Sequence, residues 1–265
     1  MADRPIITLL TDFGTADTFV GVMKGVILGI APHVHLVDLT HEVPPQAVAV
    51  AAFLLETAWR EFPQGTIHLV LVDPGVGSSR RPLAAEGRHG RFVVPDNGVL
   101  TPVLEAGEVT ALHALTRAEF FRRPVSRTFH GRDVFAPVSA HLANGVSVAA
   151  LGPPVSDPVR LDLPRPEPLP DGGTAGRVLH VDRFGNLITN LPQALFDPDR
   201  GVPVVTVGGQ RIRGLADSYA AAPAGHPGAI VGSAGTLEIF LPGGSAAAAL
   251  DVARGASVTV TFTRG

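Results

Sequence analysis

The chain of 265 residues contains no cysteine, which excludes disulfide bonds, thiolate metal ligands and cysteine nucleophiles. Long apolar runs are also missing. The longest, Ala47 to Leu55, is far shorter than a membrane span, and the first residues carry no apolar segment of signal-peptide length. We therefore expect a soluble, cytoplasmic protein that does not enter a membrane.

An excess of basic charge is missing too. The net charge is −3 and no basic face is sustained along the chain, so we expect no nucleic-acid partner. Small molecules and further copies of this chain are the expected partners. A hydrophobic content of 45% is ample for a core, in one large domain or two smaller ones.

The first 157 residues alternate between short apolar strands and helical patterns, and each strand ends in a polar turn. This rhythm predicts an α/β domain with a mainly parallel sheet and helices on its faces. The expected strands are Ile6–Leu10, Val34–Leu39, His68–Val72 and Arg91–Pro95. The expected helices are Thr15–Ile30, Gln46–Phe62, a short one from Pro102 and Val134–Leu142.

A proline-rich stretch follows, and we predict that residues 158–173 are a linker between domains. Residues 174–265 carry short strands between glycine-rich turns and little helix, which predicts a small all-β, barrel-like domain. The expected strands are Thr174–Val181, Val202–Val207, Gln210–Ile212, Ala229–Val231, Thr236–Leu241 and Ala256–Phe262.

One candidate site lies at the end of the strand His68–Val72, where Asp73 opens a loop with two glycines, two serines and the pair Arg80–Arg81. In open α/β sheets, ligands bind outside the carboxyl ends of the strands. A turn capped by Asp73 with solvated arginines is an equal alternative on these residues alone. A second polar cluster contains His130 and Asp133 before a helix, where capping by Asp133 is the alternative to an anion-binding role.

Several kinds of site are not supported by the residue pattern. Neither metal-ligand spacing nor a G-x-S-x-G nucleophile elbow is present, and the sequence has no P-loop or G-x-G-x-x-G. We therefore expect no metal and no cofactor. Asp, Arg and His side chains without a protein nucleophile suit the positioning and activation of water.

Six motifs occur in order from the N-terminal strand to the last third of the chain. They read T-D-F-G-T-A-D-T-F-V-G-V-M-K-G, V-D-P-G-V-G-S-S-R-R, P-D-N-G-V-L, T-F-H-G-R-D-V-F-A-P, V-D-R-F-G-N-L-I-T-N-L and G-S-A-G-T-L-E-I. With these motifs the chain resembles the S-adenosyl-L-methionine (SAM) hydroxide adenosyltransferase family, also called SAM hydrolase, which is related to fluorinase and chlorinase. The resemblance implies hydrolysis of SAM to adenosine and L-methionine by an activated water that attacks ribose C5′. It also implies a homotrimer whose sites lie between subunits.

The resemblance assigns roles to individual residues. Asp73, Arg80 and His130 match the residues that activate water. Asp12 matches the carboxylate that holds the ribose hydroxyls, and Phe129 matches an aromatic wall. The other implied substrate-binding residues are Asp17, Asp182, Asn186, Tyr219, Ser233 and Glu238. Arg81 is left as a solvated or interface charge.

A few positions separate hydroxide from halide as the nucleophile. The halogenases have a tyrosine in place of Asp73, and Gly131 stands where the fluorinase has a serine that contacts fluoride. These differences favour hydroxide, with a chlorinase-like activity or a non-catalytic SAM- or adenosine-binding protein as alternatives. Two positions depart from the family pattern: Ala234 lacks a usual hydroxyl, and Pro242 has no amide donor for adenine.

Overall fold

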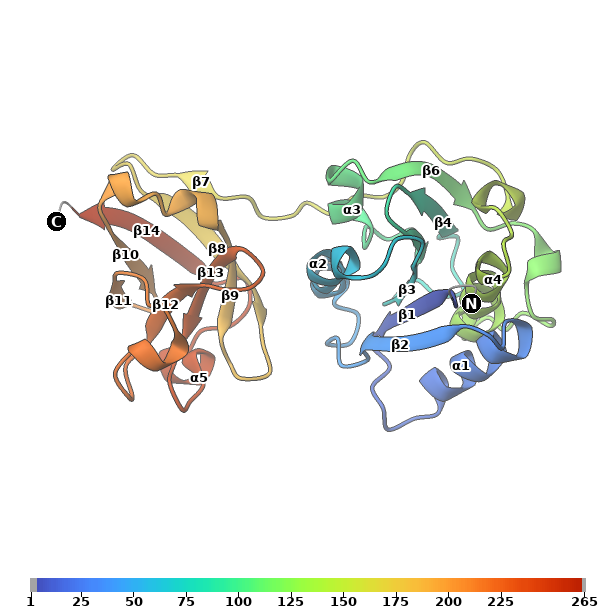
Figure 1. Cartoon of the computed structure of the whole chain (residues 1–265), viewed down its shortest axis with the longest axis horizontal. Helices are drawn as coiled ribbons and strands as arrows, with labels where there is room; N and C mark the ends of the chain where they lie inside the picture. The colour runs from blue at the N-terminus through green and yellow to red at the C-terminus, as the bar shows by residue number, and fades with distance from the viewer. Residues whose placement is uncertain (1–3, 264–265) are drawn as a thin grey trace. The chain divides into compact units, whose positions relative to one another are not determined.

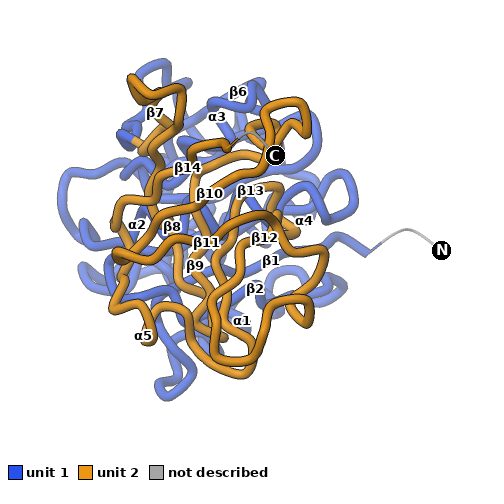
Figure 2. Tube along the Cα trace, turned by 90° about the vertical axis from the view of Figure 1, so that its left-hand side faces the viewer, with its two compact units in different colours: residues 1–162 blue, residues 163–265 orange. Residues whose placement is uncertain are grey.

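The computed structural model describes residues 4–263 and divides the chain into two compact units, residues 1–162 and 163–265 (Figure 2). The boundary between them falls inside the predicted linker, 158–173. Part of that segment is ordered into a strand, β7 (Glu167–Pro168), which pairs antiparallel with a strand of the second unit. Within residues 4–263 no helix is long and apolar enough to cross a membrane.

Unit 1 is built on a six-stranded sheet with the strand order β2-β1-β3-β5-β4-β6 (Figure 1). The strands are β1 (Ile6–Thr11), β2 (His35–Thr40), β3 (Ile67–Leu71), β4 (Pro82–Gly87), β5 (Arg91–Pro95) and β6 (Val109–Ala114). The first four in the sheet are mutually parallel, and β4 is antiparallel to both of its neighbours. The mainly parallel sheet is therefore confirmed. β4 and β6 were not among the predicted strands. β4 opens with a proline and offers small alanines where buried strands usually carry branched residues.

Helices cover both faces of this sheet. One face packs against α1 (Phe19–Ile30) and α4 (Ala136–Ala143), and the other against α2 (Val48–Ala58) and the short α3 (Thr101–Glu105). Successive strand residues point to opposite faces. Leu9 accordingly belongs to the α1/α4 core and Leu10 to the α2/α3 core. The one-turn helical segments of the chain are Trp59–Glu61, Ala118–Phe120, Val148–Leu151, Gln193–Leu195, Pro198–Arg200 and Tyr219–Ala221.

The strand order decides where unit 1 can hold a ligand. The chain runs from β1 to β2 on one side and to β3 on the other, so the order reverses between β1 and β3. In doubly wound sheets the crevice at such a switch point, outside the carboxyl ends of the strands, is the usual ligand site. Asp12 directly follows β1, and Asp73 follows β3 by two residues.

Unit 2 is an antiparallel sheet with the path β11-β10-β14-β8-β9-β13-β12, which curls into a nearly closed barrel (Figure 1). Its strands are β8 (Thr174–Val181), β9 (Leu187–Pro192), β10 (Val202–Val207), β11 (Gln210–Arg213), β12 (Gly228–Val231), β13 (Thr236–Phe240) and β14 (Ser257–Thr263), with a short helix α5 (Ala246–Leu250). Alternate residues of these strands, among them Val178, Val205 and Ile239, fill one core. The all-β, barrel-like prediction is confirmed.

Candidate active site

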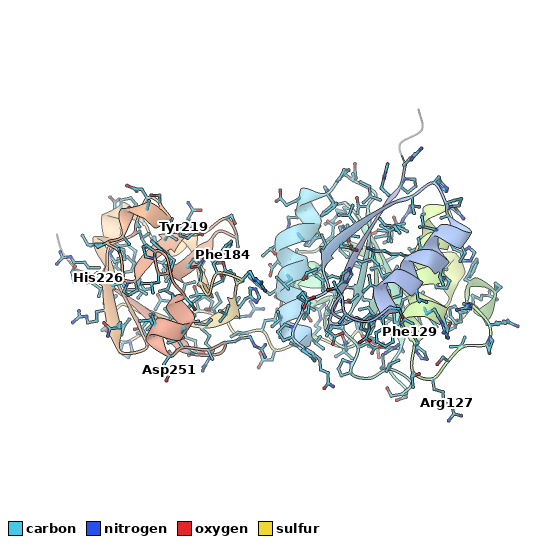
Figure 3. The ribbon with its side chains drawn as sticks, turned by 90° about the horizontal axis from the view of Figure 1, so that it is seen from below. Arg127, Phe129, Phe184, Tyr219, His226 and Asp251 are labelled. Carbon is cyan, nitrogen blue, oxygen red and sulfur yellow. The ribbon has the colours of Figure 1, made fainter. Side chains whose placement is uncertain are left out.

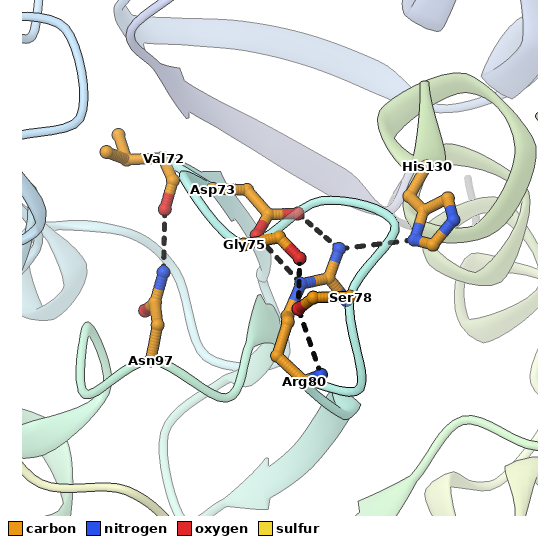
Figure 4. A network of polar contacts seen from close by, with 7 residues as sticks. All are labelled: Val72, Asp73, Gly75, Ser78, Arg80, Asn97 and His130. Atoms are coloured by element: carbon orange, nitrogen blue, oxygen red, sulfur yellow. Dashed lines mark hydrogen bonds and ion pairs between the residues drawn. The ribbon is translucent and has the colours of Figure 1, made fainter. Parts of the chain in front are cut away.

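The loop after β3 places Asp73 and Arg80 in a two-point ion pair. The Nε atom of Arg80 donates to Oδ1 of Asp73 at 2.7 Å, and Nη2 donates to Oδ2 (Figure 4). Only 5% of the Asp73 side chain and 9% of the Arg80 side chain are exposed. Two parallel charge-assisted hydrogen bonds fix the planes of both groups. Both carboxylate oxygens of Asp73 are thus engaged by Arg80, so this carboxylate orients the guanidinium.

The loop itself is held in a compact turn. Ser78 Oγ donates to the Gly75 carbonyl at 2.6 Å and accepts from the Arg80 amide at 3.3 Å. Gly77 has a φ of 76°, and a Cβ there would lie 2.3 Å from the carbonyl oxygen of Arg127. Only glycine fits this close approach, which packs the loop against the segment that leads to His130.

His130 is the third member of the cluster. Its Nδ1 lies 3.2 Å from Nη2 of Arg80. Because a guanidinium can only donate, Nδ1 must be the unprotonated acceptor. Burial lowers the pKa of His130, and the positive charge of Arg80 lowers it further. The imidazole is therefore neutral near pH 7 and has a lone pair on the side that faces Arg80.

A π-helical turn, Gly131–Phe135, joins His130 to α4. Inside it the fully buried Asp133 accepts hydrogen bonds from Arg132 Nε at 2.7 Å and from the backbone amide of Ser126 at 2.8 Å. Burial alone raises the pKa of Asp133, but these bonds outweigh burial and leave it below its usual value. The ionised carboxylate thus ties both ends of the segment that presents His130.

Aromatic side chains lie on the same unit. Phe129 packs edge-on against Phe19 with ring centroids 5.3 Å apart and against Phe13 at 6.2 Å, and Phe19 is 44% exposed.

Two carboxylates lie near these rings in the sequence. Asp12 accepts a hydrogen bond from the backbone amide of Gln46 at 2.8 Å. Asp17 lies in the exposed turn before α1.

Unit 2 has a pocket of about 600 Å³. It is lined by Asp182, Phe184, Asn186, Tyr219, Phe240, Leu241, Pro242, Gly243 and Gly244. Asp182 organises the turn on one side, since its carboxylate accepts from the Asn186 amide at 2.8 Å and from Asn186 Nδ2 at 3.0 Å. Phe184 is 76% exposed and Tyr219 is 49% exposed, and both belong to unit 2 (Figure 3).

Glu238 stands behind the wall of this pocket. Its carboxylate is buried and accepts a hydrogen bond from the Tyr219 hydroxyl at 2.7 Å. Burial raises the pKa of Glu238, and burial together with this bond raises the pKa of Tyr219 to about 12. Glu238 therefore supports Tyr219 from behind, while Ser233 lies exposed in a separate turn and is not among the pocket-lining residues.

The structure gives partners to Arg81 and brings Asn97 to the site. The Arg81 side chain is 36% exposed, and its guanidinium bonds Asp96 and Asp157, each at 2.8 Å. Asn97, in the same turn as Asp96, bonds the backbone next to Asp73. The signal was the motif P-D-N-G, which was used only to recognise the family. In the described part of the chain no group of three or more His, Cys, Asp or Glu is placed to hold a metal ion.

Comparison with known proteins gives a consistent result. A (R)-S-adenosyl-L-methionine hydrolase of Thermus thermophilus is 42% identical over 264 residues, which cover 96% of this chain and 98% of the relative. A hydrolase of the same name from Salinispora tropica is 40% identical over 98% of this chain and 99% of its own. A fluorinase of an Actinoplanes species is 30% identical over 71% of this chain and 72% of its own.

A solved structure of an uncharacterised conserved protein from Thermotoga maritima aligns with a TM-score of 0.90 at 37% identity, covering 96% of this chain and 99% of that one. Residues 7–152 match the SAM hydroxide adenosyltransferase N-terminal domain and residues 176–259 match the C-terminal domain. The chain belongs to the SAM hydroxide adenosyltransferase family.

Proposed function

We propose that this protein hydrolyses S-adenosyl-L-methionine to adenosine and L-methionine, by attack of water on ribose C5′. The observation that carries the proposal is the cluster of Asp73, Arg80 and His130 at the carboxyl edge of the sheet. It holds charge and a proton acceptor but no nucleophilic side chain. The (R)-SAM hydrolase names of relatives about 40% identical over the full chain support the same reaction.

In this reaction the nucleophile needs activation and the leaving group does not. Methionine leaves a sulfonium as a neutral thioether, so the leaving group needs no proton. Bulk water has a pKa of about 15.7, and it becomes a useful nucleophile only when a base takes its proton or when positive charge stabilises the hydroxide that forms.

The three side chains divide this work. Arg80 stays charged at any physiological pH and offers its guanidinium to the developing hydroxide. Its Nη1 is buried and has no hydrogen-bond partner among the described residues. Neutral His130 accepts the proton of the water when its Nδ1 lone pair exchanges the hydrogen bond from Arg80 Nη2 for one from that water, and Asp73 keeps Arg80 in the required plane. The water oxygen must stand in line with the C5′–sulfur bond about 3 Å from C5′.

Binding is the task of the remaining residues that the sequence singled out. We assign the ribose hydroxyls to Asp12, because a carboxylate beside the switch point accepts from a vicinal diol. We assign the rest of the substrate to Asp17, Phe129, Asp182, Asn186, Tyr219 and Ser233, with Glu238 supporting Tyr219. The relatives' names specify the (R) form. The prefix L already gives the configuration of the α-carbon of methionine, so (R) gives the configuration of the sulfonium sulfur. We propose that this protein also prefers the (R) epimer at sulfur.

We further propose that the protein is a cytoplasmic homotrimer in which unit 1 of one subunit and unit 2 of its neighbour share a substrate molecule. Exposed aromatic rings on both units, Phe19 on the first and Phe184 and Tyr219 on the second, support a surface that becomes covered. Mixing an Arg80→Ala variant with an Asn186→Ala variant should then restore sites in mixed trimers. The assay is run at a SAM concentration well below KM, where both variants are impaired, and a mixture that gains no activity there after subunit exchange would contradict shared sites.

The direct test is to incubate purified protein with each sulfonium epimer of SAM and to separate the products by chromatography. We expect equal amounts of adenosine and methionine, from the (R) form preferentially. Formation of 5′-chloroadenosine in chloride buffer would instead assign a halogenase, and unchanged SAM with measurable binding would assign a binding protein.

A further inference from the structure

The turn at the end of β5 lies beneath the loop that carries Asp73 and Arg80. In the sheet β5 stands between β3 and β4, and the loop runs from the end of β3 to the start of β4. The loop must therefore cross over the carboxyl end of β5. The residues of that end, Asp96 and Asn97, are in position to contact both ends of the loop.

Asn97 holds the beginning of the loop. Its Nδ2 donates to the carbonyl oxygen of Val72 at 2.8 Å (Figure 4). Its Oδ1 accepts from the Val99 amide at 3.2 Å. Val72 is fully buried and lies beyond the last β3–β5 pair, Leu69 with Val93. The carbonyl of Val72, directly before Asp73, has no partner in the β3–β5 ladder, and the Asn97 side chain supplies its hydrogen bond.

Asp96 holds the end of the loop. Its backbone amide donates to the Arg81 carbonyl at 2.9 Å, and its carboxylate accepts from Arg81 Nε at 2.8 Å. The side chain of Asp96 is only 4% exposed. Asp96 therefore holds Arg81 by both its backbone and its side chain. Since Arg81 directly follows Arg80, these bonds also fix the backbone next to Arg80.

We propose that Asn97 and Asp96 are positioning residues for the hydrolysis, acting through the backbone on either side of the Asp73–Arg80 pair. The ion pair fixes the two side chains relative to each other, and the β5 turn fixes the pair relative to the sheet. Displacing the pair by about 1 Å while its internal geometry stays intact costs on the order of a hundredfold in rate. This inference rests on the proposed SAM hydrolysis.

The test is the Asn97→Asp variant, which keeps the acceptor for Val99 and replaces the donor to Val72 by a carboxylate oxygen. We expect kcat for adenosine formation to fall about 10- to 100-fold while KM changes less than about threefold. The matched control is Asn144→Asp, because Asn144 also donates its amide to a backbone carbonyl of unit 1, that of Ile30, at 3.0 Å. The control bond is solvent-exposed, so the control should leave kcat unchanged.

A double-mutant cycle separates positioning from general destabilisation. Asn97→Asp should cost much less in an Arg80→Ala background than in the wild type, because the group it positions is already gone. Equal costs in both backgrounds, or a normal kcat in a folded Asn97→Asp protein, would overturn the inference. A wild-type protein that produces no adenosine would instead overturn the proposed function, so the two failures are distinguishable.

Discussion

The candidate sites of the two units differ in chemistry and in exposure. In unit 1 Asp73, Arg80 and His130 are linked to one another, and the two charged side chains are almost fully buried. In unit 2 an open pocket is lined largely by aromatic and backbone groups, and its two most exposed aromatic side chains are Phe184 and Tyr219. Charges held in a fixed geometry at low dielectric can stabilise a transition state. Apolar walls with a few polar anchors bind a substrate and orient it.

This difference leads to a division of labour. Substitutions at the charged cluster of unit 1 should change kcat, while substitutions at the pocket of unit 2 should change KM. The unit 1 cluster also needs a scaffold that cannot shift, and the close packing of Gly77 against Arg127 provides one. The unit 2 pocket tolerates more variation, since Phe184 is mostly exposed.

The largest effect is expected for Arg80→Ala. The change removes the charge that stabilises hydroxide and leaves the Asp73 carboxylate buried without its partner. We expect kcat for adenosine formation to fall at least about a hundredfold, with KM changed only a few-fold. Steady-state kinetics with a folded protein, verified by circular dichroism, measures both values. A rise in KM with normal kcat would contradict the assignment of catalysis to unit 1 and of substrate binding to unit 2.

A smaller effect is expected in unit 2 for Tyr219→Phe. The ring keeps its edge-on contact with Phe240, with centroids 5.0 Å apart, but the hydrogen bond to Glu238 is lost. We expect KM to rise about three- to tenfold with kcat within about twofold, because one buried hydrogen bond contributes roughly 1 kcal/mol. A tenfold loss of kcat at unchanged KM would mean that the pocket takes part in the chemical step.

The pKa of Tyr219, about 12, adds a control to the same experiment. The phenol keeps its proton across the neutral range, so the KM of the wild type should not change between about pH 7 and 9 on account of this group. Any pH dependence of kcat below neutrality should instead follow His130, whose pKa lies below its usual value. Protonation at Nδ1 removes the base, and kcat should therefore fall as the pH falls.

The smallest effect on activity is expected for His68→Phe, which tests stability. His68 is fully buried on β3, its ring stacks on Phe92, and burial lowers its pKa to about 4. Unfolding returns it to a value near 6.5, so the unfolded chain binds more protons between these values and stability falls as the pH falls from 6.5 to 4. Between pH 6.5 and 5 the loss from this group is about 2 kcal/mol.

Denaturant titrations of unit 1 unfolding at those two pH values check this prediction. The phenylalanine variant should lose about 2 kcal/mol less than the wild type over the same interval, while its kcat at pH 7.5 stays near normal. Identical losses in both proteins would show that His68 does not control the acid sensitivity of unit 1.

Much of the fold was predictable because the strands of unit 1 are continuous apolar runs that stop at polar turns. Ile6–Thr11 and Ile67–Leu71 differ from their expected ranges by one residue at each end at most. β4 was not predictable because its small residues resemble a loop and its pairing with β6 joins segments about 30 residues apart, although its pairing with β5 is a local hairpin. β9 was not among the predicted strands, although its residues alternate between buried and half-buried positions.

The site was predictable to a lesser degree. Asp73, Arg80 and His130 were selected from the sequence and lie together in the structure, but spacing could not reveal that both carboxylate oxygens of Asp73 bind Arg80. The contacts of Arg81 with Asp96 and Asp157 depend on chain segments 15 and 76 residues away. Such partners follow from the strand order of the sheet, which no local pattern in the sequence determines.

The most direct test of the account is hydrolysis of SAM in water enriched in oxygen-18, with mass analysis of both products. Attack of water on C5′ puts the solvent oxygen into the 5′-hydroxyl of adenosine, and methionine keeps its mass. We therefore predict adenosine heavier by two mass units and unlabelled methionine. Adenosine without the label, or a 5′-halogenated nucleoside in its place, would contradict hydroxide transfer to C5′.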